Sequence, residues 1–297
     1  MSLIGSLSSG VTGLQTFSKD LEVIGNNIAN INTTAFKSGS LGFTESFSNT
    51  LRASQPSGGT ISNVQASQIG SGVKIAGINV NFNQGALSTT GQATDLGISG
   101  DGFFLVRDNS GVNYATRDGN FRWDDSGALV NSMGMNVLGL TGDHTTAPST
   151  NMGPIRRDDS PTATGATLQS IAIDRTGSVV QFYSDGSNAT VGQVLLQKFS
   201  QPSSLMKHGD GLYSSLNNAG PTGGLFTGAA LTVGTALDYK AGNNGNGTIE
   251  AGTLEQSNVD LTSEFANMIT AQRSFQANAR VVTVSDTVLD DIVNLKR

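Results

Sequence analysis

Apolar side chains recur every seven residues near the N-terminus of the chain. They form two N-terminal seams, the first with Leu7, Leu14, Leu21 and Ile28 and the second with Leu3, Phe17, Ile24 and Ile31. This spacing is the pattern of a coiled coil over about four heptads, interrupted at Gly10. Helix propensity is low here, because each glycine in a helix costs about 1 kcal/mol relative to alanine. We therefore predict an N-terminal helix that needs a partner along its apolar stripe.

The C-terminal end of the chain repeats the seven-residue spacing. It forms two C-terminal seams, the first with Leu261, Met268, Phe275, Val282 and Leu289 and the second with Phe265, Ala279 and Val293. Gln272 and Asp286 interrupt the second of them. We predict a helix over about residues 260–295, on the order of 50 Å long at 1.5 Å per residue. Asp260 or Ser257 is suited to cap its start.

The energetics of these two helices favour assembly with other subunits. Burying about eight seam residues contributes about 1.5–3 kcal/mol for each side chain. Ordering about sixty residues costs about 1–2 kcal/mol for each residue, which is several times the gain. We therefore predict that the two helices pair and that all four seams form an assembly interface between subunits. Packing of both stripes on the rest of the same chain is the alternative.

Between the two ends, the period of the apolar pattern changes to two. Short apolar runs at 96–98 and 103–106 flank the turn signal Gly100-Asp101-Gly102. Further runs at 171–173, 179–182 and 194–196 alternate with turns that contain Asp and Gly. This pattern predicts an antiparallel all-β central domain. The chain is therefore predicted to be of the α+β class, with N- and C-terminal helices that form a coiled-coil-like pair.

The domain organisation follows from these patterns and from two polar stretches rich in Gly, Ser and Asn, which predict connectors. The predicted order is an N-terminal helix and turn over 1–48, a connector over 49–69, a β-rich domain over 70–239, a second connector over 240–253 and a C-terminal helix over 254–297. Residues 141–168 contain three prolines and predict a loop or small insertion in the β-rich domain.

Composition limits the function. The 38 glycines and 13% of charged residues suit short strands that are joined by tight turns. A net charge of −6 argues against a broad basic surface for nucleic acid. The first fifteen residues lack the basic start and long apolar block of a secretory signal peptide. No stretch approaches the roughly 18 apolar residues that a membrane span requires.

The sequence offers few groups for catalysis. Cysteine is absent, and the two histidines, His144 and His208, are not accompanied by a set of metal-ligand residues at a typical spacing. Most Asp residues lie in turn motifs, where their side chains bond the local backbone. We therefore predict no catalytic, cofactor-binding or metal-binding residues and no enzymatic activity. An enzyme is the alternative of a different class, and an acid–base pair in a pocket would support it.

The run VIGNNIANINTTAFKSG, from Val23 to Gly39, resembles the N-terminal signature of the bacterial flagellar rod and hook proteins. The signature residues in this chain are Asn26, Asn27, Asn30, Asn32, Phe36 and Lys37. Later runs are similar to other parts of the same family, at 95–106, 114–139, 192–215 and 254–295. The resemblance covers both ends of the chain and most of its middle.

The resemblance implies a subunit whose terminal helices form the inner tube of a hollow filament, with the β domain as an outer layer. It implies helical self-assembly and export through the flagellar type III apparatus, without a cleaved signal peptide. The other partners that it implies are the distal rod protein, the hook cap and the hook–filament junction protein. It implies no cofactor and a place in the flagellar hook or basal body, outside the cytoplasmic membrane.

Within the family, the start of the chain and the run Asn258-Val259-Asp260-Leu261 resemble the hook protein. We therefore predict a hook subunit, which acts as a flexible coupling that transmits motor torque to the filament. The alternative is the distal rod protein, a rigid drive shaft. Its size is closer to that of this chain, since residues 141–168 are too few for the extra outer domain of many hook proteins.

Overall fold

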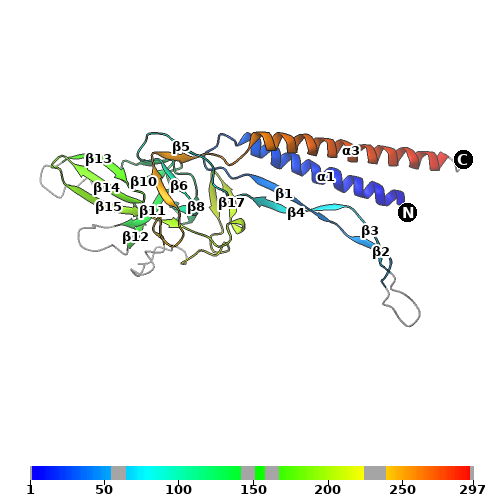
Figure 1. Cartoon of the computed structure of the whole chain (residues 1–297), viewed down its shortest axis with the longest axis horizontal. Helices are drawn as coiled ribbons and strands as arrows, with labels where there is room; N and C mark the ends of the chain where they lie inside the picture. Colours follow the sequence, from blue (N-terminus) through cyan, green and yellow to red (C-terminus); the bar gives the residue numbers. More distant parts are fainter. Residues whose placement is uncertain (1, 55–64, 142–150, 158–166, 224–238, 295–297) are drawn as a thin grey trace. The chain divides into compact units, whose positions relative to one another are not determined.

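The computed structural model describes residues 2–54, 65–141, 151–157, 167–223 and 239–294 (Figure 1). The chain divides into two compact units. The first unit contains Met1–Ile31, Ser38–Asn81 and Val259–Arg297, and the second contains Asn32–Lys37 and Phe82–Asn258. Both units are therefore assembled from segments that lie far apart in the sequence.

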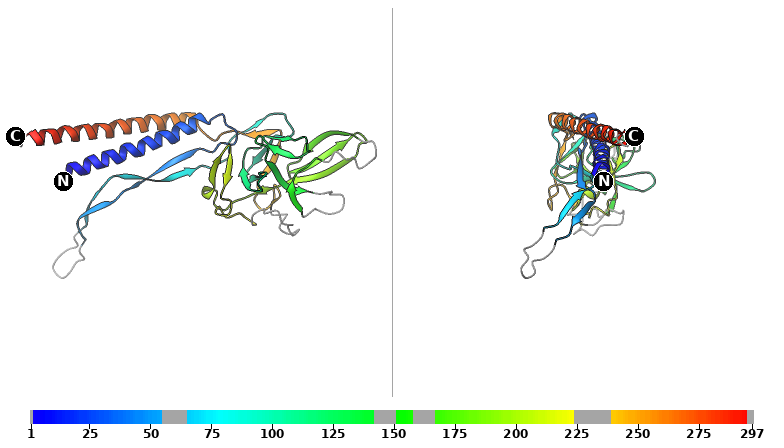
Figure 2. Two further views of the ribbon diagram at one scale, coloured as in Figure 1. Left: turned by 180° about the vertical axis from the view of Figure 1, so that it is seen from behind. Right: turned by 90° about the vertical axis from the view of Figure 1, so that its right-hand side faces the viewer.

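The first unit holds the two predicted helices, α1 (Ser2–Ala29) and α3 (Leu261–Asn294). They lie side by side and run in opposite directions, with both chain ends at the same end of the pair (Figures 1 and 2). The hydroxyl oxygens of Ser6 and Ser285 are 3.5 Å apart. Towards the other end of the pair, Asn27 hydrogen-bonds Glu264 at 3.2 Å. The predicted pair of terminal helices is confirmed. Among the described residues, no helix is sufficiently long and apolar for a membrane span.

Asp260 caps the start of α3. Its Oδ1 accepts a hydrogen bond from the backbone N–H of Thr262 at 3.0 Å, and its Oδ2 accepts one from the Ser263 hydroxyl at 2.9 Å. The bond from Ser263 and the backbone bond from Thr262 lower the pKa of Asp260 below its ordinary value. Of the two caps considered from the sequence, Asp260 therefore fills this role.

The first unit also contains an extended antiparallel ribbon. β1 (Gly39–Glu45) pairs with β4 (Val73–Val80), and β2 (Ser48–Arg52) pairs with β3 (Ser67–Gly70). The predicted connector over 49–69 is therefore corrected, because its described residues include most of β2 and most of β3. The polar composition concealed these strands, whose residues are all exposed and bury no apolar face. For the same reason, the predicted start of the β-rich domain at 70 is corrected to Phe82.

The second unit is a β domain in which every strand pairing is antiparallel. Its strands are β5 (Leu87–Thr89), β6 (Leu96–Ser99), β7 (Phe103–Arg107), β8 (Asn113–Thr116), β9 (Phe121–Trp123), β10 (Leu129–Asn131), β11 (Asn136–Thr141), β12 (Asn151–Pro154), β13 (Leu168–Ile173), β14 (Ser178–Tyr183), β15 (Asn188–Val194), β16 (Leu196–Gln197), β17 (Met206–Gly209), β18 (Leu212–Ser214), β19 (Thr248–Ala251) and β20 (Thr253–Glu255). A short 3-10 helix, η1 (Pro202–Ser204), precedes β17. The predicted antiparallel β domain is confirmed.

The main sheet of the second unit has the order β13-β14-β15-β11-β7-β8-β18-β17, with β9, β10, β12 and β16 attached at its side. β19 pairs with β6, and β20 pairs with β5. The predicted connector over 240–253 is therefore corrected: it contains β19, whose Ile249 is fully buried in the core. Glycines on both sides of these strands gave the segment the composition of a linker. The predicted loop over 141–168 lies largely outside the described residues, apart from β12 and its neighbours.

The core of the second unit lies on both faces of β7. Phe104 and Val106 belong to one apolar cluster, while Phe103 and Leu105 belong to another. All four side chains are buried. This arrangement follows from the two-residue period of a strand, because successive side chains point to opposite faces. β7 is thus a central strand, and both apolar clusters of the domain include its side chains.

Candidate functional site

Small and polar residues that recur every seven positions lie in the contact between α1 and α3. Ser6 faces Ser285, and a Cβ on Gly13 would lie 2.8 Å from the Asn278 amide nitrogen. Asp20 and Ala271 line one pocket, and Asn27 bonds Glu264. Val282 of a predicted seam also lies in this contact, where a Cβ on Gly10 would be 3.0 Å from its Cγ2. The helices of one chain therefore pair mainly through small and polar residues, and most residues of the four apolar seams are left partly or fully exposed.

The N-terminal seams are only partly covered. Ile24 is buried, and the others with described side chains are half-buried: Leu7, Leu14, Phe17, Leu21, Ile28 and Ile31. The side chain of Leu3 lies outside the described residues. The Phe17 ring packs on Phe43 of the ribbon, with a centroid distance of 5.4 Å. The ribbon and α3 thus each cover part of the apolar surface of α1.

The C-terminal seams are the least covered. Leu261, Phe265, Phe275 and Val293 are exposed, and Met268, Ala279, Val282 and Leu289 are half-buried. The structure adds exposed apolar residues that the heptad assignment missed: Ile269, Val281, Val284, Val288 and Ile292. A period of 3.6 residues, rather than a strict heptad, would have found several of them. We call the exposed members of both groups the α3 apolar surface. Nine large apolar side chains among the described residues of one helix are thus exposed, which favours an interaction site along α3.

A groove of about 790 Å³ adjoins this surface between α1, the ribbon and α3. Leu14 and Phe275, which belong to different predicted seams, both line it. Val73 and Ile75 of β4 add apolar side chains, and Lys19, Glu22 and Lys74 add charged ones. Leu14 of α1 and Phe275 of α3 thus line the same groove, which an apolar side chain can fill.

The signature residue Asn27 has a defined position in the first unit. Its side chain is buried, and its Nδ2 donates to the Gly39 carbonyl at 2.8 Å and to Glu264 at 3.2 Å. Its Oδ1 accepts a hydrogen bond from the Gly39 N–H at 2.9 Å. Asn27 therefore joins the end of α1 to the first residue of the ribbon and to the first turn of α3.

The other asparagines of the signature lie at the end of α1. The Asn30 side chain donates to the Asn26 carbonyl at 2.9 Å, which satisfies a backbone acceptor at the helix end. Asn26 and Asn32 are exposed. Among the signature asparagines at this end, Asn30 is therefore the one whose side chain bonds the helix backbone.

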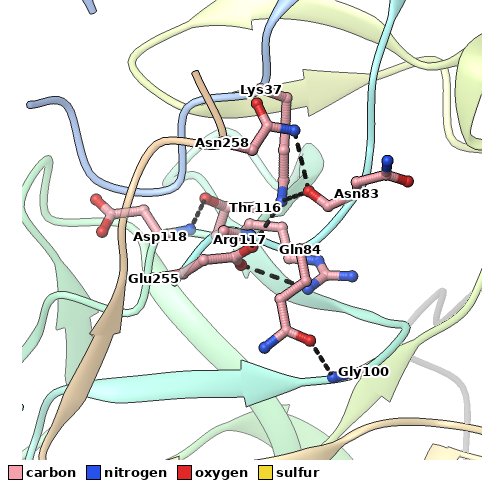
Figure 3. A network of polar contacts seen from close by, with 10 residues as sticks. Lys37, Asn83, Gln84, Gly100, Thr116, Arg117, Asp118, Glu255 and Asn258 are labelled. Atoms are coloured by element: carbon pink, nitrogen blue, oxygen red, sulfur yellow. Dashed lines mark hydrogen bonds and ion pairs between the residues drawn. The ribbon is translucent and has the colours of Figure 1, made fainter. Parts of the chain in front are cut away.

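Lys37, the last signature residue, is fully buried in the second unit (Figure 3). Its Nζ donates to Glu255 Oε1 at 2.6 Å, while Arg117 Nη1 lies 3.4 Å from Glu255 Oε2. Burial lowers the pKa of both cations, and the Glu255 carboxylate opposes that shift. Phe36, which precedes Lys37, lies under the Lys207 ammonium group at 4.7 Å. The sequence analysis missed Glu255 and Arg117, because only the fold brings them to Lys37.

The described residues offer little for catalysis or metal binding. Among the described residues, no cluster of three or more His, Cys, Asp or Glu side chains could hold a metal ion. His208 packs beside the Tyr114 ring, and His144 lies outside the described residues. The prediction of no enzymatic activity stays a prediction.

Comparison with known proteins places the chain in a family. It is 36% identical to the flagellar basal-body rod protein FlgG of Bacillus subtilis over 295 residues, which cover 99% of this chain and 100% of the relative. The chain belongs to the flagellar rod and hook protein family. Members of this family are structural components of the flagellar basal body and hook, so the resemblance inferred from the sequence is confirmed.

Three family descriptions match separate parts of this rod and hook family member. They are "Flagella basal body rod protein" at residues 7–37, "Flagellar hook protein FlgE/F/G D1 domain" at 97–181 and "Flagellar basal body rod FlgEFG protein C-terminal" at 250–295. Lys37, Arg117 and Glu255 thus each lie in a different matched segment. The buried ion pairs join all three.

Hook proteins match this family member less closely. The flagellar hook protein FlgE of Salmonella typhimurium is 25% identical over 433 aligned positions, which cover 98% of this chain and 100% of the relative. Much of that hook protein therefore has no counterpart here. The crystal structure of Helicobacter pylori hook protein FlgE2 aligns with a TM-score of 0.23 at 11% identity, over 65% of this chain and 47% of that chain, and supports no argument.

Proposed function

We propose that this chain is a structural subunit of the flagellar rod that assembles with copies of itself, as the distal rod protein does. The observation that carries this proposal is the end-to-end alignment with FlgG, at 36% identity and with 100% of the relative covered. The hook prediction is the second candidate. It is favoured less, because the hook alignment extends to 433 positions for a chain of 297 residues.

The α3 apolar surface supports self-assembly. Phe265 is 49% exposed, Val284 is 61% exposed and Val293 is 67% exposed, although all three are large apolar side chains. Covering apolar area contributes about 25 cal/mol for each Å² removed from water. A copy of the same chain supplies the matching apolar surface in every subunit, so a helical homopolymer can cover all of them at once.

The remaining assignments belong to the same proposal. The subunit is placed in the flagellar axis outside the cytoplasmic membrane and is exported by the flagellar type III apparatus. As a rod subunit, it is followed by the hook, so its contacts with hook components lie at its distal end. Its role is mechanical rather than enzymatic, which agrees with the absence of cysteine from the sequence.

The first prediction tests the assembly surface with Phe265→Asp. A carboxylate in a packed apolar contact loses its hydration without gaining a partner, so polymerisation should fail. Because Phe265 is exposed in the single chain, melting of the β domain should not change. Sedimentation and electron micrographs of the purified protein report assembly, while circular dichroism reports melting.

Gln276→Asp is the matched control, since Gln276 is an exposed polar residue of the same helix and the substitution adds the same charge. It should assemble far better than Phe265→Asp. Normal polymers of Phe265→Asp would contradict the role of the α3 apolar surface. Rod is separated from hook by deleting the gene in its native bacterium: basal bodies that keep a full rod and lack only the hook would overturn the rod proposal.

A further inference from the structure

The chain passes between the two units at four points: before Asn32, after Lys37, before Phe82 and after Asn258. Three segments of the second unit lie at these points, and we call residues 32–37, 82–86 and 254–258 the exit segments. They are bonded to one another through the backbone. The Ala35 N–H donates to the Glu255 carbonyl at 2.8 Å, and the Gln256 N–H donates to the Ala86 carbonyl at 2.8 Å.

The carboxylate of Glu255 lies at the centre of the exit segments (Figure 3). Its Oε1 accepts hydrogen bonds from Lys37 Nζ at 2.6 Å and from the Gly85 N–H at 2.9 Å. The Lys37 ammonium group also donates to the Asn83 carbonyl at 2.8 Å. One carboxylate and one ammonium group therefore hold all three exit segments.

Arg117 attaches this cluster to the β domain. Its Nη1 lies 3.4 Å from Glu255 Oε2, and its guanidinium group lies over the Phe103 ring at 5.1 Å. Phe103 is a buried residue of the central strand β7. Among the described residues, Arg117 Nε has no hydrogen-bond partner. Phe82 of the second exit segment also packs on Phe103, with 5.8 Å between the ring centroids. Glu255 therefore supplies the charged part of the link from the exit segments to the core.

The charges in this cluster are unequal. Two buried cations, Lys37 and Arg117, share the single carboxylate of Glu255. Removing either cation leaves one buried pair, whereas neutralising Glu255 leaves two buried cations that repel one another. An uncompensated buried charge is the costly case. Glu255 is therefore the residue whose loss should open the cluster.

Close packing adds to this arrangement. A Cβ on Gly85 would clash with the carbonyl oxygen of Gln256, so only glycine allows the two segments to lie this close. The Gly85 N–H can therefore reach the Glu255 carboxylate directly.

We propose that Glu255 is a conformational clasp, which holds the exit segments closed on the β domain through its ion pairs with Lys37 and Arg117. This role goes beyond the rod proposal and does not depend on it, because it is a property of the single chain. In a subunit that transmits torque, force between the units must pass along these segments. The clasp would prevent them from peeling away from the β domain under that force.

Amide hydrogen exchange on the full-length monomer tests the clasp. Glu255→Gln keeps the shape of the side chain and removes its charge. It should speed exchange at least about tenfold in the exit segments, while β7 and β14 keep their protection. Lys37→Met and Arg117→Met should each have a smaller effect. Glu250→Gln is the matched control, because the half-buried Glu250 forms an ion pair with the exposed Arg175 at 3.6 Å, and it should change neither region.

Two outcomes would overturn the clasp. One is unchanged exchange in the exit segments of Glu255→Gln, and the other is equal acceleration in the exit segments and in β7. If Glu255→Gln does not fold, the triple variant Lys37→Met, Arg117→Met, Glu255→Met takes its place, since apolar replacement of a complete buried ion group is commonly tolerated. That variant should fold with faster exchange in the exit segments, and native-like protection there would overturn the proposal as well.

Discussion

At the scale of single residues, the signature contains side chains with different roles. Asn27 and Lys37 are both buried, and each connects segments that are distant in the sequence. Asn26 and Asn32 are exposed, and the Asn26 side chain accepts only a long hydrogen bond of 3.4 Å from Asn30 among the described residues. The resemblance to the family identified all of them. The resemblance could not show which of them matter most for the structure, because that depends on their burial and on their hydrogen-bond partners.

The burial of Lys37 illustrates what sequence reasoning cannot supply. Lysine is almost never fully buried unless it is paired, so its presence in a turn predicts an exposed side chain. Its partner Glu255 is 218 residues away, and no local pattern connects the two. Only the folded chain shows that the end of the N-terminal signature and the start of the C-terminal match form one ion pair.

The side chain of Asn27 gives a prediction at this scale. Asn27→Ala removes three hydrogen bonds and leaves the half-buried Gly39 backbone N–H without the Asn27 acceptor. The cost should be about 1–3 kcal/mol in the stability of the first unit. Thermal melting of the helical circular dichroism signal measures it. The control Asn26→Ala changes an exposed residue of the same type, and equal melting of the two variants would contradict the role of Asn27.

At the scale of elements, the helices could be predicted and the ribbon could not. The helix prediction succeeded because apolar residues recur with a helical period over more than twenty positions. The face that pairs the helices was missed, since Gly13, Ala271 and Ser285 carry no apolar signal. β2 and β3 were missed for a related reason, because a ribbon with all residues exposed has no buried face to produce alternation.

The cap of α3 gives a prediction at this scale. The hydrogen bonds to Asp260 lower its pKa from the ordinary value of 3.8, so the folded state binds fewer protons there than the unfolded state. The contribution of the cap is therefore present above pH 3.8 and is lost as the pH falls through the lowered pKa. The protection factors of the Thr262 and Ser263 amides, which compare the observed exchange with that of an unstructured chain at the same pH, should fall in that acidic range.

Asp260→Ala should show the same low protection in the first turn of α3 at neutral pH, without further change on acidification. Asp286→Ala is the control, because Asp286 is an exposed residue in the interior of the same helix. Protection of the first turn that does not depend on pH in the native chain would contradict the role of the cap.

At the scale of the whole molecule, the prediction of two helices flanking a β domain was right and the division into domains was not. The polar stretches that were predicted as connectors contain part of the ribbon and all of β19. The chain passes between the units elsewhere, before Asn32, after Lys37, before Phe82 and after Asn258. A polar, glycine-rich composition identifies a linker only where the segment does not pair with another strand. Here β19 pairs with β6 and buries Ile249, which nearby glycines conceal in the sequence.

The two units also differ in how much apolar surface they bury, which gives the last prediction. Among the described residues of the first unit, Ile24 is the one large apolar side chain that is fully buried, whereas the second unit has two apolar clusters around β7. Ordering a residue costs about 1–2 kcal/mol, and helices rely on tertiary packing for most of their stability. The free subunit should therefore exchange amides quickly in α1 and α3 and slowly in β7 and β14. On polymerisation, protection should rise in α3 most of all, because its apolar surface becomes covered. Strong protection of both helices in a proven monomer would show that they need no neighbouring subunit, and would contradict assembly through α3.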